Sequence, residues 1–120
     1  MANILLIDDD ELQLAMQRAI LTAEGHTVFT TADGPHGIEI FKSRPIDLVL
    51  LDVGIPSMSG FEVLKELKNI NPEIKVIIIT AYPSIESAKL SMKYNADDYI
   101  QKPFEVEYYL ERIKNALQNV

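Results

Sequence analysis

Acidic, hydroxyl and amino side chains follow four short apolar segments of this sequence. They are Asp8 and Asp9 after residues 4–7, Asp52 after residues 48–51, Thr80 after residues 76–79 and Lys102 after residues 99–101. If the segments are parallel strands, their carboxyl ends bring these groups to the same edge of one sheet. Carboxylates held together raise one another's pKa and repel each other. The pattern therefore indicates a site that handles a cation, a phosphoryl group or a proton.

The chemistry of these residue types favours phosphoryl transfer. Asp8, Asp9 and Asp52 together suit a hard divalent cation, and Mg²⁺ commonly binds one or two carboxylates with waters and phosphate oxygens. A carboxylate is also a nucleophile toward phosphorus and then forms an aspartyl phosphate. Lys102 and Thr80 offer a cation and a hydroxyl to the added oxygens. Because the charges then roughly balance, we favour phosphoryl transfer over metal binding alone.

Size and composition exclude several other classes. The chain has 120 residues and no cysteine, which excludes disulfides and thiol chemistry. Its apolar runs are far shorter than the roughly 20 residues of a membrane span. The net charge of −7 disfavours a nucleic-acid-binding surface, which would be basic. Met1 leads almost at once into an apolar segment, which leaves no room for a signal peptide. We therefore expect one cytoplasmic domain over residues 1–120 that binds neither nucleic acid nor membrane.

Five apolar segments alternate with five amphipathic segments along the whole chain. The expected strands are residues 4–7, 27–31, 48–51, 76–79 and 99–101. Each is followed by apolar residues at helical spacing. Such strict alternation predicts an α/β fold around a parallel sheet, with right-handed crossovers.

Apolar residues at helical spacing mark the expected helices. The first stripe is Leu12, Ala15, Met16, Ala19, Ile20 and Ala23. In the fourth helix, which Ser84 can cap, the stripe is Ile85, Ala88 and Met92. In the last helix it is Val106, Tyr109, Leu110, Ile113 and Leu117. Asp10 and Glu11 are expected to favour the start of the first helix rather than bind metal.

The motifs together resemble the receiver domain of two-component response regulators, the CheY-like superfamily. They lie in the segments 4–11, 48–60, 77–81 and 99–104, and the resemblance spans essentially all of the chain. It implies a flavodoxin-like (βα)5 three-layer sandwich with a parallel five-stranded sheet of order 2-1-3-4-5.

The resemblance also implies an acceptor and a metal site. Asp52 is expected to accept the phosphoryl group. Asp9 would bind Mg²⁺ (or Mn²⁺) directly, and Asp8 would hold it partly through water. Asp52 and the backbone carbonyl of Gly54 would complete the protein ligands.

Further roles follow from the same resemblance. Thr80 would hydrogen-bond the phosphoryl group, and Lys102 would pair with it. Pro103 would follow a cis peptide bond, which is almost confined to proline. Tyr99 would turn inward when Thr80 moves.

The expected partners are a sensor histidine kinase or a histidine phosphotransfer protein as donor, and an effector domain or target protein. The chain would assist its own phosphorylation and dephosphorylation without turning over a separate substrate. Its output surface would comprise residues 84–93, Tyr99 and residues 106–112. Asp97, Asp98 and Arg112 resemble charges that some receivers use across a phosphorylation-linked homodimer.

Three other classes fit less well. An aspartate-nucleophile phosphatase needs a second Asp two residues after the nucleophile, where this chain has Gly54. A flavodoxin needs a phosphate-cradling loop after its first strand, and residues 8–10 would repel that phosphate. An interaction module with a dead site is disfavoured because every expected site residue is present.

Several single residues complete the predictions. His26 and His36 are interpreted as solvated. Gly54 and the bulky Tyr82 are predicted to set the lifetime of the phosphoryl group, with Tyr82 screening the attacking water.

Overall fold

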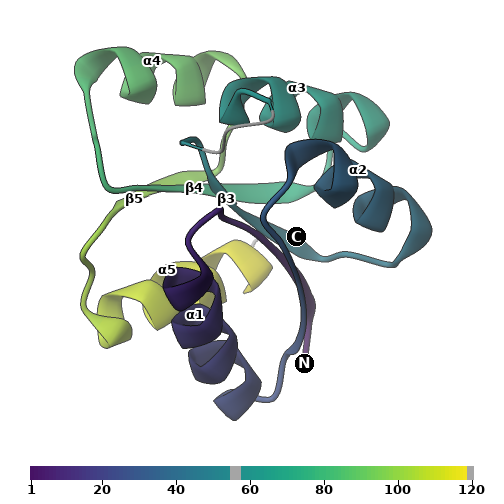
Figure 1. Cartoon of the computed structure of the whole chain (residues 1–120), viewed down its shortest axis with the longest axis vertical. Helices are drawn as coiled ribbons and strands as arrows, with labels where there is room; N and C mark the ends of the chain where they lie inside the picture. Colours follow the sequence, from purple (N-terminus) through teal and green to yellow (C-terminus); the bar gives the residue numbers. More distant parts are fainter. Residues whose placement is uncertain (55–57, 119–120) are drawn as a thin grey trace.

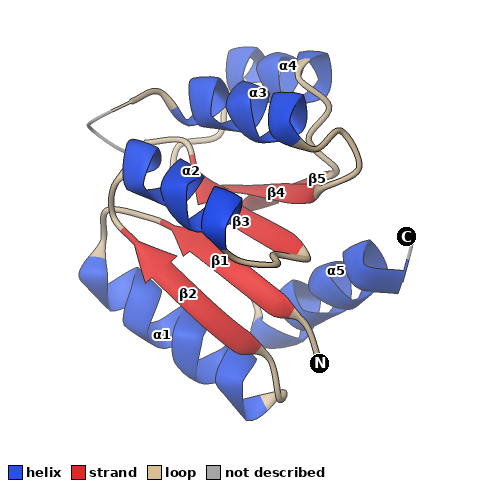
Figure 2. Ribbon diagram, turned by 90° about the vertical axis from the view of Figure 1, so that its right-hand side faces the viewer, coloured by secondary structure: helices blue, strands red, loops and turns tan. Residues whose placement is uncertain are grey.

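The computed structural model describes residues 1–54 and 58–118, and within them the chain forms a five-stranded parallel sheet and five helices. The strands are β1 (Asn3–Ile7), β2 (Thr27–Thr31), β3 (Leu48–Asp52), β4 (Lys75–Thr80) and β5 (Asp98–Gln101). The helices are α1 (Glu11–Ala23), α2 (Gly34–Ser43), α3 (Gly60–Ile70), α4 (Ile85–Lys93) and α5 (Val106–Gln118). Figure 1 traces the chain from the N-terminus to the C-terminus, and Figure 2 shows the strand order β2-β1-β3-β4-β5. Residues 55–57, within the motif segment 48–60, lie outside the described part.

The helices form two layers around the sheet, which confirms the predicted three-layer α/β sandwich. Helices α1 and α5 cover one face, and α2, α3 and α4 cover the other (Figure 2). None of the helices in the described ranges combines the length and the apolar character needed to cross a membrane.

Strands β1, β3 and β4 are almost wholly apolar because helices cover both faces of the sheet. Alternate side chains enter opposite cores. Ile4 and Leu6 pack in the core with residues of α1 and α5, whereas Leu5 and Ile7 pack with α2 and α3. Burying each such side chain contributes roughly 1.5–3 kcal/mol. The result is a rigid frame whose strand ends are fixed relative to one another.

Side-chain caps set where the helices begin. Asp10, Asp33, Ser59 and Ser84 each accept a hydrogen bond from a backbone N–H in the first turn of the following helix. The predicted cap at Ser84 and the helix-start role of Asp10 are thereby confirmed. Gly25 follows the end of α1 with a φ of +91°, a left-handed conformation that glycine adopts without strain.

The apolar stripe of α1 is mostly exposed. Leu12 is 82% exposed and Met16 is 41% exposed, whereas Gln17 and Leu21 are buried and Ile20 packs against the core. A polar residue is tolerated on the inner face because the buried Tyr109 hydroxyl donates a hydrogen bond to Gln17 Oε1 at 2.8 Å. This pair satisfies both polar groups, so Gln17 can face the core.

Helix α4 also exposes most of its apolar stripe. Ile85 and Met92 are each 78% exposed, whereas Ser87 and Ala88 are half-buried and Ser91 is buried. Ser91 Oγ donates to the Ser87 carbonyl at 2.8 Å, which satisfies it within the helix. Helix α4 therefore contributes little to the apolar core. The predicted amphipathic helix α5 is confirmed, because its stripe from Tyr109 onward packs in the core, although Val106 is half-exposed.

Candidate functional site

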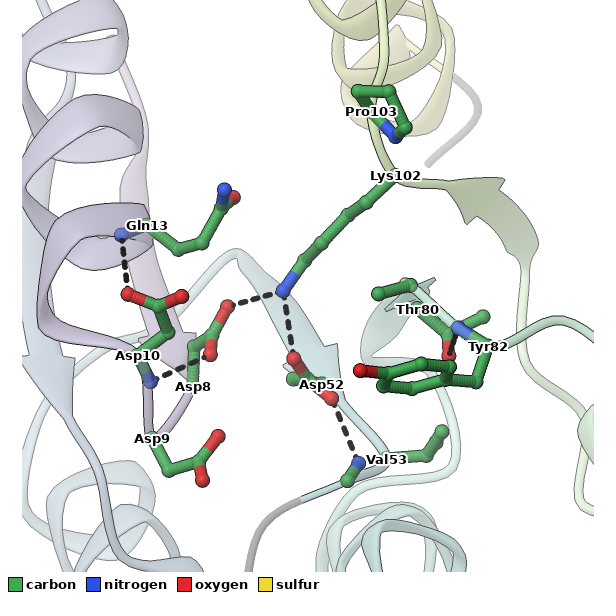
Figure 3. A pocket seen from close by; sticks show the side chains of 12 residues that line it. Asp8, Asp9, Asp10, Gln13, Asp52, Val53, Thr80, Tyr82, Lys102 and Pro103 are labelled. Atoms are coloured by element: carbon green, nitrogen blue, oxygen red, sulfur yellow. Dashed lines mark hydrogen bonds and ion pairs between the residues drawn. The ribbon is translucent and has the colours of Figure 1, made fainter.

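The carboxyl ends of β1, β3, β4 and β5 surround one pocket of about 670 Å³ (Figure 3). The predicted site residues in its lining are Asp8, Asp9, Asp52, Gly54, Thr80, Lys102 and Pro103. The parallel sheet thus brings together groups that are up to 94 residues apart in the sequence, as for Asp8 and Lys102. Among the predicted site residues, Tyr99 is not part of this lining.

Three carboxylates form the acidic part of the pocket. Asp8, Asp9 and Asp52 each offer one oxygen, and these oxygens lie within 4.8 Å of one another. The backbone N–H of Asp8 donates to the Thr31 carbonyl at 3.1 Å, which extends the sheet hydrogen bonding to the site. Asp8 Oδ1 accepts from the Asp10 N–H at 2.9 Å. Asp8 is buried, Asp52 is half-buried and Asp9 is exposed, so the cluster opens outward at Asp9.

The Lys102 ammonium joins two of these carboxylates. Its Nζ lies 2.7 Å from Asp8 Oδ2 and 2.7 Å from Asp52 Oδ2. Burial by itself lowers the pKa of Lys102, but the hydrogen bonds to Asp52 and Asp8 outweigh burial, so the pKa is raised. Burial raises the pKa of Asp8, and this effect outweighs the opposing hydrogen bond from Lys102. The carboxylate at Asp8 would therefore gain from a further cation beside it.

Gly54 fixes the other oxygen of Asp52. The Gly54 N–H donates to Asp52 Oδ1 at 2.7 Å, so both oxygens of Asp52 have a donor. A Cβ at position 54 would lie 3.2 Å from Asp52 Oδ1, closer than ordinary van der Waals contact. Glycine at this position therefore keeps the Asp52 carboxylate uncrowded.

The β4 and β5 ends form the opposite wall. Thr80 is buried, and its Oγ1 accepts from the Tyr82 N–H at 3.1 Å. The Thr80 carbonyl accepts from the Lys102 N–H at 2.7 Å. Tyr82 is 87% exposed, yet it lines the pocket, and its ring lies on the Asp52 side of Thr80 (Figure 3). The peptide bond between Lys102 and Pro103 is cis, as predicted.

Tyr99 lies on β5 away from the pocket. Its hydroxyl is 2.5 Å from Ser87 Oγ of α4. The half-buried Tyr99 ring therefore connects β5 to the first turns of α4.

The interpretation of the two histidines as solvated is wrong for His26 but holds for His36, which is exposed. His26 is half-buried, and its Nδ1 accepts from the Ala2 N–H at 3.1 Å. Burial lowers the pKa of His26. His36 Nδ1 lies 2.9 Å from Thr31 Oγ1, so it too has a partner within the fold. His26 thus contacts the backbone before β1, and His36 contacts the end of β2. The polar residues around each histidine in the sequence do not reveal these contacts.

Gln13 is a pocket residue that the sequence interpretation missed. It lies on α1 and lines the pocket beside Lys102. A glutamine within a helix carries no motif, and only its spacing four residues after Asp9 could have drawn attention to it.

The donor set fits a hard divalent cation. Asp8, Asp9 and Asp52 carry about three negative charges when ionised, and Lys102 offsets about one of them. Carboxylate and carbonyl oxygens are the ligands that Mg²⁺ and Mn²⁺ prefer. The residues present therefore suit such an ion and leave room in the pocket for a further group.

Comparison with known proteins agrees with this site. The family model for the response regulator receiver domain matches residues 4–114. The transcriptional regulatory protein ZraR of Escherichia coli is 37% identical over 115 residues, which make up 96% of this chain and 26% of ZraR. The chain thus spans about a quarter of the length of that relative. It belongs to the response regulator receiver domain family.

Two solved structures are closely similar. A receiver domain protein (CheY-like) from Methanospirillum hungatei is 34% identical, with a TM-score of 0.95 over 98% of this chain and 94% of its own. The response regulator TrrA from Thermotoga maritima was solved in complex with Mg²⁺–BeF. It is 32% identical, with a TM-score of 0.89 over 98% of this chain and all of its own, 100%.

Proposed function

We propose that this receiver domain accepts a phosphoryl group onto Asp52 from a phosphohistidine, carried by a sensor histidine kinase or a histidine phosphotransfer protein. The observation that carries the proposal is the position of Asp52. It lies in one pocket with Asp8 and Asp9, and 2.7 Å from the Lys102 ammonium. Supporting it, the relative TrrA binds Mg²⁺–BeF, a species that resembles a phosphoryl group beside its metal.

Asp8, Asp9, Asp52 and the Gly54 carbonyl would hold Mg²⁺ or Mn²⁺. When bound, the ion supplies positive charge that lowers the repulsion between the incoming phosphoryl oxygens and the carboxylates. The exposed side of the pocket at Asp9 leaves a route by which hydrated ions can enter.

The transfer step uses the residues of the chain as follows. An oxygen of Asp52 attacks phosphorus, and the new O–P bond forms as the P–N bond of the phosphohistidine breaks. The imidazole nitrogen leaves with the bonding electron pair. The Lys102 ammonium and the Thr80 hydroxyl each donate a hydrogen bond to phosphoryl oxygens, which stabilises the charge spread over them.

The acyl phosphate is later hydrolysed. Water attacks phosphorus, the O–P bond to Asp52 breaks, and inorganic phosphate leaves with the carboxylate restored. The domain is in this sense a switch that assists its own phosphorylation and dephosphorylation.

The phosphorylated state would be read at α4, β5 and α5. If Thr80 turns toward the phosphoryl group, Tyr99 gains space to move inward and gives up Ser87. Contacts present only in the phosphorylated form then bias the population of two conformers. An effector domain or a separate target in the cytoplasm would bind this surface.

Acetyl phosphate and Mg²⁺ test the proposal. The protein should gain one phosphoryl group that is stable in acid and labile in base, as an acyl phosphate is. Excess EDTA should abolish the uptake, and Asp9→Asn should lower it strongly. Undiminished uptake with EDTA present would contradict the proposed metal site, and the absence of any uptake would contradict the function.

A further inference from the structure

Gln13 carries a polar atom that the fold leaves unsatisfied. Its Oε1 is fully buried without a hydrogen-bond partner, and it is the only such side-chain atom within residues 1–54 and 58–118. A buried acceptor left without a donor destabilises the folded state. Native structures contain few such atoms, so each one needs a physical reason.

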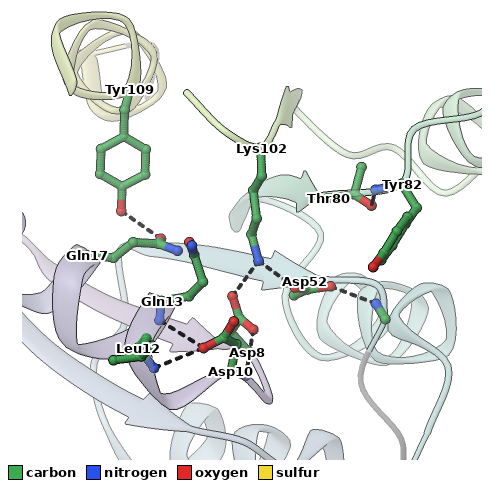
Figure 4. Close-up of polar contacts among 11 residues, drawn as sticks. Asp8, Asp10, Leu12, Gln13, Gln17, Asp52, Thr80, Tyr82, Lys102 and Tyr109 are labelled. Atoms are coloured by element: carbon green, nitrogen blue, oxygen red, sulfur yellow. Dashed lines mark hydrogen bonds and ion pairs between the residues drawn. The ribbon is translucent and has the colours of Figure 1, made fainter. Parts of the chain in front are cut away.

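The start of α1 fixes the backbone of Gln13. Its backbone N–H donates to the Asp10 cap at 3.2 Å, which fixes the residue at the start of α1. From there the side chain reaches into the space between α1 and Lys102 (Figure 4). Gln13 and Lys102 line the same pocket. By contrast Gln17, one turn further along, is paired with Tyr109 and is not part of the lining.

The Lys102 ammonium can supply the hydrogen-bond donor that Gln13 Oε1 lacks. An ammonium group has three N–H donors, and two of those on Lys102 are used by Asp8 and Asp52. When a phosphoryl group is present, both carboxylates would interact with groups other than Lys102. Asp52 becomes the acyl phosphate, and Asp8 faces the cation. Lys102 then needs another acceptor besides the phosphoryl oxygen.

We propose that Gln13 is a positioning residue whose Oε1 accepts a hydrogen bond from Lys102 when the pocket holds a phosphoryl group. This inference rests on the proposed function. Gln13 Oε1 is then unpaired in the resting protein because its hydrogen bond forms only in the phosphorylated protein. The amide holds the ammonium against the phosphoryl oxygens after Lys102 releases Asp8.

Gln13→Met tests the proposal, because methionine has a similar length and lacks the amide. In the resting protein the substitution removes an unpaired buried group, so the melting temperature should rise by about 2–6 °C. In the presence of Mg²⁺ and beryllofluoride, a phosphoryl mimic, the affinity for the mimic should fall about tenfold. Calorimetric titration gives the affinity, and fluorine NMR reports the bound species. Gln13→Leu serves as a second apolar variant.

Gln17→Met is the matched control on the same face of α1. It removes the acceptor of the buried Tyr109 hydroxyl, so the melting temperature should fall while the affinity for beryllofluoride stays unchanged. An unchanged affinity in both Gln13 variants would overturn the inference, as would a fall in their melting temperature like that of Gln17→Met. If the wild-type chain itself does not bind beryllofluoride, the proposed function fails rather than the role of Gln13.

Discussion

At the scale of single residues, the Lys102 ammonium and a metal ion would compete for the same carboxylate oxygens. The Lys102 ammonium holds Asp8 and Asp52 at 2.7 Å in the resting protein, in positions where a metal ion would also bind carboxylate oxygens. Binding the ion therefore has to weaken existing ion pairs. We expect this competition to keep the affinity of the resting site for metal moderate and to free the ammonium for an incoming phosphoryl group.

We predict that Tyr82 limits how fast water reaches the phosphoryl group. Its ring lines the pocket on the side where Gly54 offers no side chain. Tyr82→Ala should raise the rate of dephosphorylation by up to about tenfold, which corresponds to about 1.4 kcal/mol of barrier. The loss of label from purified phosphoprotein measures the rate. Tyr82→Phe keeps the ring and should hydrolyse as the wild type does, and equal rates for Tyr82→Ala and wild type would exclude the screening role.

His26 makes stability depend on pH. Its Nδ1 accepts from the Ala2 N–H, so the folded protein favours the neutral ring, and burial lowers its pKa from 6.5. Below that value the unfolded chain binds more protons at His26 than the folded chain does. The free energy of unfolding should therefore fall as the pH falls from about 7 to 5.

Denaturant unfolding of wild type and His26→Gln measures this contribution. The difference between the two should shrink toward acidic pH, by less than about 1 kcal/mol because the ring is partly exposed. A difference that is constant across this range would mean that His26 does not titrate differently in the folded chain.

The positions of the functional residues could largely be predicted from the sequence, because each follows a buried strand. Asp8, Asp52, Thr80 and Lys102 lie at strand ends, and parallel strands leave little freedom in where such ends meet. Gln13 could not be predicted because it comes from a helix. Its importance depends on a burial that only the packed structure reveals.

At the scale of elements, helix α4 differs from the other helices in how it is held. Its one fully buried residue is Ser91, and its capping box pairs Ser84 with Ser87 in both directions. Ser87 Oγ also lies 2.5 Å from the Tyr99 hydroxyl. With few apolar contacts, α4 is suited to local rearrangement.

Ser87→Ala tests this description of α4. It removes the reciprocal partner of the cap and the partner of Tyr99, so amide hydrogen exchange in α4 should become markedly faster. The expected loss of global stability is small, about 1 kcal/mol. Ser84→Ala also weakens the cap but leaves Ser87 beside Tyr99. The additional increase in the α4 exchange rate in Ser87→Ala over Ser84→Ala measures the Tyr99 contact. Equal exchange rates in the two variants would show that this contact does not stabilise α4.

Element boundaries and helix faces differed in how well the sequence predicted them. The expected strands overlap the observed ones closely because continuous apolar runs identify strands covered on both faces. The stripes through Leu12 in α1 and Ile85 in α4 identify apolar faces but not what those faces contact. In both helices a hydroxyl partner, Tyr109 or Tyr99, allows polar residues to face inward instead.

At the scale of the whole molecule, strand order decides which groups meet. The order β2-β1-β3-β4-β5 puts β1 and β3 side by side, so Asp8 and Asp52 become neighbours, and β4 and β5 add Thr80 and Lys102. The apolar segments of the sequence predict the strands but not the order of the strands in the sheet. It was available from the family resemblance, and the structure confirms it.

The charges proposed for a dimer are paired within the chain. Asp98 accepts from Arg112, and Asp97 lies 3.0 Å from Lys68. A phosphorylation-linked homodimer would have to exchange such pairs between subunits. We predict that beryllofluoride with Mg²⁺ increases the sedimentation coefficient of the chain. Arg112→Ala should reduce that increase, and identical sedimentation with and without the mimic would rule the dimer out.

The most direct test of the account is to map the phosphoryl group. The chain is treated with acetyl phosphate and Mg²⁺, cleaved at acidic pH, and its peptides are analysed by mass spectrometry beside Asp52→Ala. The account predicts that the added mass lies on the peptide containing Asp52 and is absent from the variant. Label on another residue, or equal label on Asp52→Ala, would contradict it.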